Sequence, residues 1–326
     1  MKFAATLVLS LCAATQAWLA QSSLPVSRNS VILMGSRSAS KWEKKQDLLD
    51  KRGLAGSAAA TSDDGGSSAP FAAIVGSGRI GGTLAKAGNC VVLGRVDTID
   101  PDGEGPILIA TRNDALDGIV EKCPENRRKD LVFMQNGYLD EFLESKGLLD
   151  NTQVLLYLSV TALGAEPVDG VTSVNPEGLT AATGVHAQAF ADRVAALNLK
   201  CNVVSPQDYR PAMFEKLMWI STYMLVGAAK GCKSVGEAGS EHGDLVEKIV
   251  NELIAAVSEK EGISFPAGTM ARLAAYTNVV ADFPCGVKEF EWRNKYFYDL
   301  GDEKVPTHNA LLKECAAGGL LSFELP

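Results

Sequence analysis

The stretch from Phe71 to Leu93 constrains the fold of this chain more than any other. A short apolar run, FAAIV, leads directly into the glycine-rich sequence GSGRIG, and a helical segment and a second apolar run, CVVL, follow. This order of strand, turn, helix and strand is typical of a dinucleotide-binding unit, whose glycines permit a tight turn, close approach of the backbone to a pyrophosphate, and close packing of helix on strand. The predicted cofactor-binding residues of the turn are Gly76, Ser77, Gly78, Arg79, Ile80 and Gly81. The alternative is a glycine-rich turn in an α/β domain that has lost its ligand.

The residue after the second strand bears on which dinucleotide binds. A site for NAD places Asp or Glu about twenty residues beyond the first glycine, where the carboxylate binds the ribose hydroxyls. This chain has Arg95 at that position, and a guanidinium can form paired hydrogen bonds with a 2′-phosphate. We therefore predict NADP (NADPH) as the cofactor, with Asp97 leaving NAD as the alternative.

The sequence beyond this unit first alternates between strands and helices. Residues 105–124 and 129–147 each indicate a strand, a polar switch and a helix, and residues 152–176 add a further strand and β-like sequence. Arg112 and Asn136 follow two of these strands, at the edge where an α/β sheet forms its ligand cleft. We therefore predict that both residues line the cofactor site, with an ordinary turn at Gly137 as the alternative.

From Met213 onward the apolar pattern is helical. The ranges with this periodicity are 213–230, 240–262, 267–283, 286–297 and 306–316. Residues 96–105 leave no room for the additional helix and strand of a complete Rossmann half. We therefore predict an α/β fold with an abbreviated Rossmann-type parallel sheet in residues 70–208, followed by an all-α domain in residues 209–326.

Composition excludes several classes of function. Acidic residues outnumber basic ones by 39 to 31, for a net charge of −8, so nucleic acid is a poor partner, although a local basic pocket for a phosphate is compatible. Hydrophobic residues make up 46% of the chain, but no apolar run after the predicted leader is long enough to span a bilayer. None of the seven cysteines forms a C-x-x-C pair, and the three histidines are scattered, so no metal site is indicated and the thiols of the mature protein are predicted to be reduced.

The N-terminal sequence is typical of a two-part targeting leader. Residues 1–17 have Lys2, an apolar run too short to anchor in a bilayer, and small residues before the expected cleavage site, as in a secretory signal peptide. Residues 18–69 are rich in Ser and Arg, lack acidic residues before Glu43, and end in a Gly/Ser/Ala-rich linker, as in a transit peptide. The combination resembles the bipartite plastid leaders of diatoms, which implies the chloroplast stroma. Simple secretion followed by a spacer is the alternative.

A lysine stands at the start of a segment that is apolar on every side. Residues 215–229, EKLMWISTYMLVGAA, carry two charges followed by thirteen uncharged positions, which predicts a helix buried nearly all round. Lys216 then has two interpretations. Its stem can lie on apolar surface with the ammonium in water, or the ammonium can be a proton donor at the edge of a reaction cleft.

At this point the chain resembles the ketopantoate reductase family, NADPH-dependent enzymes with an N-terminal Rossmann domain and a helical C-terminal domain related to that of 6-phosphogluconate dehydrogenase. The matching pieces, in the family's order, are IVGSGRIGG, Arg95 after LG, QNG at 135–137, FEKL at 214–217, VKEFEWRN at 287–294 and VPTHNALL at 305–312. FEKL is similar to the family's W-x-K-L, and KEFEWRN to its T-E-I-D-x-I-N-G. The similarity runs from about Phe71 to Cys315 and contains no long identical block.

The resemblance implies a role for individual residues. Lys216 would be the general acid that protonates the ketone as hydride arrives, and Glu289 would contact the cofactor and the active site. Asn294, five positions later, would belong to the substrate site. Arg95, Asn136 and, less securely aligned, Arg112 would contact the cofactor.

The departures from the family pattern concern the substrate. The family lysine is usually followed four and eight positions later by asparagines that bind the keto acid, and Ile220 and Met224 stand there in this chain. The family's substrate serine is replaced by Thr277. Because unpaired buried polar groups cost about 1–3 kcal/mol each, ketopantoate itself is disfavoured as the substrate.

Three hypotheses follow. The first is an NADPH-dependent plastid reductase of a small keto compound more apolar than ketopantoate. The second is a non-catalytic NADP-binding sensor or assembly protein that has lost the substrate asparagines. The third is a relative of 6-phosphogluconate or glycerol-phosphate dehydrogenases, which would require a basic cluster that the helical half does not show. A homodimer is compatible with each of them.

Overall fold

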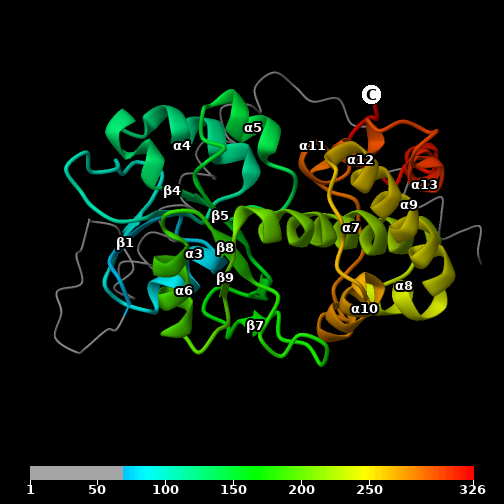
Figure 1. The fold of residues 1–326 in the computed structure, drawn as a ribbon, viewed down its shortest axis with the longest axis horizontal. Coiled ribbons are helices and arrows are strands. Elements are labelled where there is room, and N and C mark those ends of the chain that lie inside the picture. Colours follow the sequence, from blue (N-terminus) through cyan, green and yellow to red (C-terminus); the bar gives the residue numbers. More distant parts are fainter. Residues whose placement is uncertain (1–68) are drawn as a thin grey trace, which may run out of the picture. The chain divides into compact units, whose positions relative to one another are not determined.

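The computed structural model describes residues 69–326 (Figure 1). The predicted signal peptide (1–17) and the predicted transit peptide and linker (18–69) lie outside the described residues, except for Ala69. Plastid localisation therefore stays a prediction.

Seven strands form one sheet in the order β2-β1-β3-β4-β5-β8-β9. Their bounds are β1 Ala72–Val75, β2 Cys90–Leu93, β3 Ile107–Ile109, β4 Leu131–Phe133, β5 Thr152–Leu155, β8 Ala181–Thr183 and β9 Asn202–Val203. Neighbouring strands are parallel from β2 to β5, β8 runs antiparallel to β5, and β9 is parallel to β8. A separate two-stranded ribbon pairs β6 (Leu158–Ser159) with β7 (Val168–Asp169). The predicted mostly parallel sheet is confirmed.

Four helices cover the two faces of the sheet. On one face Leu84 of α3 (Arg79–Ala85) and Phe190 of α6 (Ala187–Ala195) are buried against the strands. On the other face Leu116 of α4 (Leu116–Lys122) and Leu143 of α5 (Asp140–Ser145) are buried. Two 3₁₀ segments, Asn113–Ala115 and Glu125–Asp130, precede α4 and β4. No helix or strand lies between β2 and β3, so the Rossmann-type sheet is abbreviated as predicted.

A buried arginine fixes the end of α3. Arg193 of α6 is 1% exposed, and its guanidinium donates to four backbone carbonyls. These acceptors are Pro70 O (2.6 Å), Leu84 O (3.1 Å), Gly88 O (3.0 Å) and Asn89 O (2.9 Å). A cation at a helix C-terminus satisfies carbonyls that lack partners within the helix. Arg193 therefore connects α6 to the strand–turn–helix unit.

The rest of the chain is helical, as predicted. Its helices are α7 Pro206–Lys230, α8 Val235–Glu241, α9 Gly243–Glu261, α10 Thr269–Val279, α11 Phe290–Arg293, α12 Lys295–Tyr298 and α13 Pro306–Ala317. Figure 1 shows α7 running from the sheet into the group formed by the other helices. Most of its side chains are buried, which agrees with the apolar pattern of residues 215–229.

Two helix boundaries differ from the sequence prediction. Helix α7 begins at Pro206 rather than at Met213, because Ser205 accepts a hydrogen bond from the Asp208 N–H (3.1 Å) and proline is well suited to a first turn. The predicted helix 286–297 is instead two short helices, α11 and α12, which meet at Asn294.

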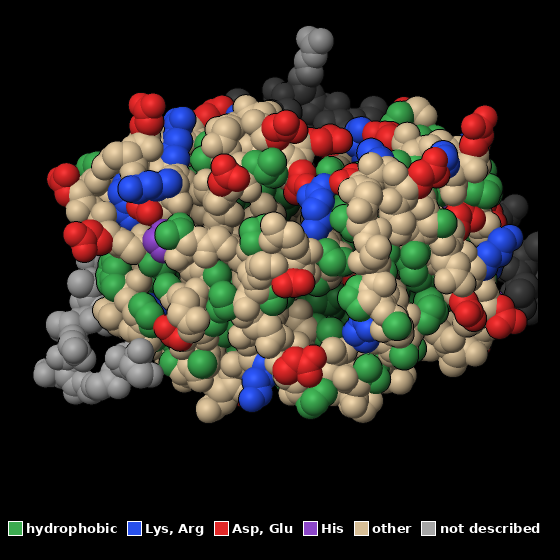
Figure 2. Space-filling model, viewed as in Figure 1, with side chains coloured by type: hydrophobic (Ala, Val, Ile, Leu, Met, Phe, Trp, Pro, Cys, Tyr) green, Lys and Arg blue, Asp and Glu red, His purple; other side chains and the backbone are tan. Residues whose placement is uncertain are grey.

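An ion-pair group joins the sheet-bearing part to the helices. Arg210 of α7 pairs with Asp140 at the start of α5 and with Glu261 at the end of α9 (2.6 Å). The Tyr296 hydroxyl donates to Glu261 (2.7 Å). Among residues 69–326, no helix is both long enough and apolar enough to cross a bilayer. On the face shown in Figure 2, acidic and basic side chains are scattered rather than gathered by sign.

Candidate functional site

The three glycines of the GSGRIG turn differ in how much space surrounds the position that a Cβ would occupy. Gly76 has φ 108°, and a Cβ there would lie 2.8 Å from the Ala110 carbonyl oxygen. A Cβ on Gly81 would lie 1.8 Å from the Gly76 carbonyl oxygen, so α3 could not pack this closely on the turn. A Cβ on Gly78 would meet nothing within 4 Å. The turn is therefore built for compactness at Gly76 and Gly81 and leaves open space at Gly78, where a pyrophosphate would approach.

The other residues of the turn lie at the start of α3. Ser77 and Arg79 are exposed, and Ile80 is half-buried against the core between α3, α6 and the sheet. The Arg79 guanidinium donates to Val160 O (3.1 Å) and Thr161 O (3.3 Å), which follow β6. Arg79 therefore ties the turn to the segment that leaves the sheet after β5 and β6.

The two predicted cofactor arginines follow β2 and β3, the parallel strands on either side of β1. Arg95 is exposed directly after β2, where the Gly94 N–H donates to the Asp97 carboxylate (2.7 Å). Arg112, after β3, is exposed and pairs with Asp114 (2.9 Å). Arg95 and the Asp97 carboxylate therefore belong to the same loop after β2.

The carboxyl ends of the parallel strands form a connected row. The Gln135 side chain donates to Ile109 O at the end of β3 (2.7 Å), and the Asn113 side chain donates to Asn136 O (3.0 Å). With neighbouring strands about 4.8 Å apart, the three steps from β1 to β5 span roughly 14 Å. The row therefore runs from the glycine turn at β1, through Gln135 and Asn136, to Leu156 after β5.

Lys216 lies at the far end of this row. It is 6% exposed, its Nζ donates to Leu156 O (2.5 Å), and Nζ lies 4.9 Å from the centre of the Tyr157 ring. Burial, and to a smaller extent the positive charge of Arg293, lower the pKa of Lys216 to about 7. The interpretation of Lys216 as a surface residue requires its ammonium to lie in bulk water, and the structure instead buries it. A buried ammonium with this pKa can exchange a proton near neutral pH.

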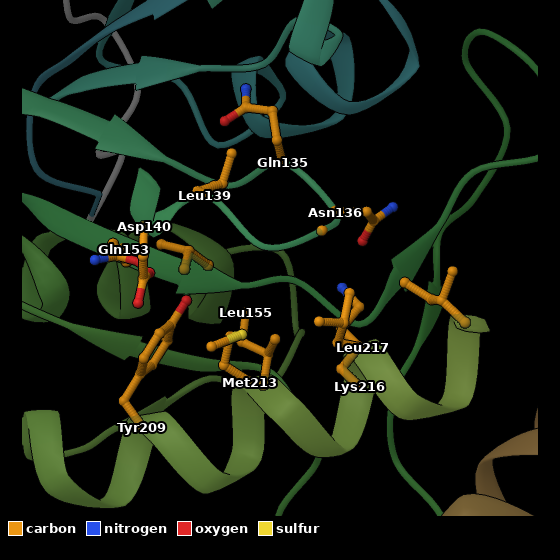
Figure 3. Close-up of a pocket in the computed structure, with 13 residues that line it drawn as sticks. Gln135, Asn136, Leu139, Asp140, Gln153, Leu155, Tyr209, Met213, Lys216 and Leu217 are labelled. Atoms are coloured by element: carbon orange, nitrogen blue, oxygen red, sulfur yellow. The ribbon is translucent and has the colours of Figure 1, made fainter. Parts of the chain in front are cut away.

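The Lys216 side chain lines a small cavity between α7 and the loop after β4 (Figure 3). Figure 3 shows the side chain rising from α7 toward the loop that carries Asn136. The lining residues are Gln135, Asn136, Gly137, Leu139, Asp140, Gln153, Val154, Leu155, Tyr209, Met213, Lys216, Leu217 and Ile220. Its volume of ≈ 20 Å³ is room for about one water molecule, so a keto compound enters only if α7 and this loop move apart.

Glu289 belongs to a segment that lies against the same loop. The Trp292 carbonyl accepts from the Tyr138 N–H (2.6 Å), and a Cβ on Gly137 would lie 2.4 Å from that carbonyl oxygen. Glu289 itself has φ 51° and ψ 52°, a left-handed conformation that costs a non-glycine residue about 1–3 kcal/mol. Its carboxylate pairs with Arg293 (2.5 Å). Glu289 is therefore connected to the surroundings of Lys216 through Arg293.

The two predicted substrate residues have partners inside the helical part. The Thr277 hydroxyl accepts from the Trp219 indole N–H (2.8 Å) and donates to Leu273 O (2.8 Å). Asn294 is 3% exposed, and its side-chain oxygen lies 3.2 Å from His308 Nε2. Burial lowers the pKa of His308 to about 4, so the imidazole is neutral at pH 7. Neither Thr277 nor Asn294 lines the cavity.

The structure thus brings Lys216 and Asn136 to one cavity, connects Glu289 to Arg293 outside the cavity lining, and holds Thr277 and Asn294 apart from it. Sequence reasoning missed two contributors. Leu156 acts through its backbone carbonyl, for which no sequence signal exists. Arg293 had a signal, because it is a charge at a position where the matching family pattern has isoleucine.

Comparisons with known proteins support the fold but not a close relationship. No family model matches the chain, and no curated protein matches it in sequence. A PanE/ApbA family ketopantoate reductase from Ralstonia eutropha JMP134 is 15% identical, with a TM-score of 0.56 over 77% of this chain and 98% of its own. A dimeric ketopantoate reductase from Staphylococcus aureus is 17% identical, with a TM-score of 0.52 over 76% and 98%.

A third solved structure of similar fold contains a nicotinamide cofactor. It is D-mandelate dehydrogenase in complex with NADH, 13% identical, with a TM-score of 0.52 over 77% of this chain and all of its own. At these identities the comparisons show the fold. The chain has the fold of the ketopantoate reductases, as the sequence resemblance predicted.

Proposed function

We propose that this protein is an NADPH-dependent reductase of a small keto compound, with Lys216 as the general acid. The observation that carries the proposal is the position of Lys216: its ammonium is buried, has a pKa lowered to about 7, and lies on the row of strand ends that begins at the glycine turn. Perturbed ionisable groups of this kind cluster at functional sites.

The residues of the turn suit a dinucleotide. The open space at Gly78 and the start of α3 would receive the pyrophosphate. When bound, the nicotinamide supplies a hydride to the carbonyl carbon. Lys216 donates its proton to the carbonyl oxygen, and the Leu156 carbonyl holds the ammonium in place. Asn136 lines the same cavity and would orient the reacting groups, and Glu289 would act through Arg293.

The preference for NADPH over NADH rests on Arg95. Arg95 is exposed directly after β2, where a guanidinium would pair with a 2′-phosphate, whereas Asp97 would repel one. The similar D-mandelate dehydrogenase was solved with NADH, which keeps NADH as the alternative to test.

The proposed substrate carries an apolar side chain. Ile220 and Leu217 line the cavity beside Lys216, where amide groups would be required to pair the polar groups of ketopantoate. Apolar walls favour a compound that does not leave buried hydroxyls without partners.

Two measurements test this function. Purified protein is titrated with NADPH and NADH by fluorescence, and then NADPH oxidation is followed with a panel of keto compounds. Lys216→Met should lower kcat by about 10²- to 10⁴-fold, with NADPH affinity retained. The matched control is Lys230→Met at the other end of α7, which pairs with Glu314 (3.2 Å) and should leave kcat unchanged. Equal rates for wild type and Lys216→Met would remove Lys216 from the mechanism.

A specific observation favours the second candidate, a non-catalytic NADP-binding sensor or assembly protein. The cavity beside Lys216 has room for about one water molecule. NADPH binding without turnover of any keto compound in the panel would support this candidate and overturn the reductase.

Two further features complete the proposal. By analogy with the dimeric ketopantoate reductase of similar fold, we propose a homodimer, which sedimentation of the purified protein tests. We also propose plastid targeting by residues 1–69, which a fluorescent fusion of these residues tests.

A further inference from the structure

Arg293 is a second cationic group near the candidate site. It does not line the cavity, and the proposed reaction so far uses it only as the partner of Glu289. Its backbone carbonyl accepts from the Ser221 hydroxyl of α7 (2.8 Å), and the neighbouring Trp292 carbonyl accepts from the Tyr138 N–H. Arg293 therefore lies where α7, the loop after β4 and the segment of Glu289 meet.

The guanidinium of Arg293 is only partly used by the protein. Its Nη2 donates to Glu289 (2.5 Å), but its Nε is buried and has no hydrogen-bond partner among residues 69–326. The Nε and one Nη of arginine form a fork that matches the two oxygens of a carboxylate. A buried donor without a partner destabilises the folded protein, so the half-used fork calls for an explanation.

We propose that Arg293 is a specificity-determining residue that binds the carboxylate of a 2-oxo acid substrate. This rests on the proposed reductase function. An acid group adjacent to the carbonyl would take the buried Nε and share Nη2 with Glu289, while the carbonyl oxygen faces Lys216. Arg293 would then replace the amide groups that Ile220 and Met224 cannot provide.

Two observations support the pairing of Arg293 with Lys216. The Trp292 carbonyl next to Arg293 accepts from the Tyr138 N–H, and the adjoining Gly137 lines the cavity together with Lys216; the charge of Arg293 also contributes to the lowered pKa of Lys216. The Arg293 side chain is 17% exposed, and a charge this far out of water gains more from an anionic ligand than an exposed one does. Glu289 neutralises part of the positive charge and keeps the guanidinium oriented in the absence of substrate.

Equilibrium binding tests the proposal without requiring turnover. The probes are oxamate, an anionic analogue of a small 2-oxo acid, and oxamide, its neutral counterpart, each titrated into the purified protein with NADPH present. We expect wild type to bind oxamate more tightly than oxamide. Arg293→Met should weaken oxamate binding by about 10- to 100-fold and leave oxamide and NADPH binding unchanged.

Two further variants keep the test decisive. Arg293→Lys retains the charge and a partner for Glu289 but lacks the fork, so it should fold and still bind oxamate at least fivefold more weakly than wild type. Lys288→Gln removes an exposed charge from the same segment and should bind oxamate as wild type does.

The outcomes separate this proposal from the function beneath it. Oxamate binding that is unchanged in Arg293→Lys, or equal affinities of wild type for oxamate and oxamide, would overturn the role of Arg293 and leave the reductase intact. Failure of wild type to bind either NADPH or NADH would overturn the reductase itself. In turnover of a 2-oxo acid, Arg293→Lys should raise KM more than it lowers kcat, because the carboxylate contact exists in ground and transition states alike.

Discussion

The glycine turn and the surroundings of Lys216 lie at opposite ends of one row of strand ends, and they are built differently. The turn depends on backbone sterics within a few residues: the Gly76 carbonyl leaves no space for a side chain on Gly81. Lys216 depends on groups far away in the chain, namely the Leu156 carbonyl and the Arg293 charge. The difference teaches that the cofactor end fixes the residue type at Gly76 and Gly81, whereas the substrate end can exchange side chains around a retained lysine.

The largest effect is expected at Gly81. In Gly81→Ala the new methyl group would lie 1.8 Å from a backbone oxygen, so we expect a loss of about 3 kcal/mol or more in the free energy of unfolding. Gly78→Ala is the matched variant, because its methyl group would meet nothing within 4 Å. It should keep stability within about 0.5 kcal/mol and lose NADPH affinity.

Urea unfolding and an NADPH titration of both variants check this prediction. If Gly78→Ala bound NADPH as tightly as wild type, the turn would not hold the pyrophosphate. If Gly81→Ala were as stable as wild type, the backbone account of the cofactor end would be wrong.

The next effect concerns the pH dependence of stability at the other end. Lys216 loses its proton near pH 7 in the folded protein and near 10.5 when unfolded. Between these values the unfolded chain binds one more proton, so the free energy of unfolding rises with pH. Relative to Lys216→Met, the gain of wild type should be about 0.7 kcal/mol per pH unit at pH 7, where half of the folded molecules are still protonated, and should approach about 1.4 kcal/mol per pH unit between pH 8 and 9. Urea unfolding of both proteins at pH 7, 8 and 9 measures this difference, and parallel curves would show that Lys216 is not desolvated.

The same difference between the local glycine turn and the long-range contacts of Lys216 decides which parts of the fold the sequence could predict. The strand–turn–helix unit, the parallel sheet and the helical second half were predictable, because they are written in local periodicity and glycine spacing. The start of α7 was missed although Ser205 and Pro206 are typical of a helix start, because the prediction followed the apolar pattern, which is helical only from Met213 onward.

The candidate site was only partly predictable for a related reason. Lys216 and Asn136 could be singled out from short motifs, and the structure places both at one cavity. The pairing of Glu289 with Arg293 has the i,i+4 spacing of a helical ion pair, but the sequence does not show that the charge of Arg293 acts on Lys216. The hydrogen bond from Trp219 to Thr277 joins two helices, and a contact between helices cannot be read from the periodicity of either helix.

A smaller effect tests whether Thr277 is structural or binds substrate. Its hydroxyl already accepts from Trp219 and donates to Leu273. Thr277→Val should therefore cost about 1–2 kcal/mol of stability, because the indole N–H is left without a partner, and KM for the keto substrate should stay within about twofold. Thermal unfolding and steady-state kinetics measure the two quantities. A raised KM at unchanged stability would instead place Thr277 in the substrate site, as the family resemblance implies.

The smallest effect is expected at the cofactor end. It tests whether a side chain there can be replaced to change cofactor affinity without disturbing the turn. The Asp97 carboxylate accepts from the Gly94 N–H beside Arg95, at the edge where the 2′-phosphate would bind. Asp97→Asn keeps an acceptor oxygen for that N–H and removes the negative charge. Because charges at a partly exposed site interact weakly, NADPH affinity should rise only about two- to fivefold, and NADH affinity should not change. Titration with both cofactors at low and high salt measures the change, and the gain for NADPH should shrink as salt increases. An equal gain for both cofactors would show that Asp97 shapes the loop rather than opposing the phosphate, and the rigid character of the cofactor end would then extend beyond its glycines.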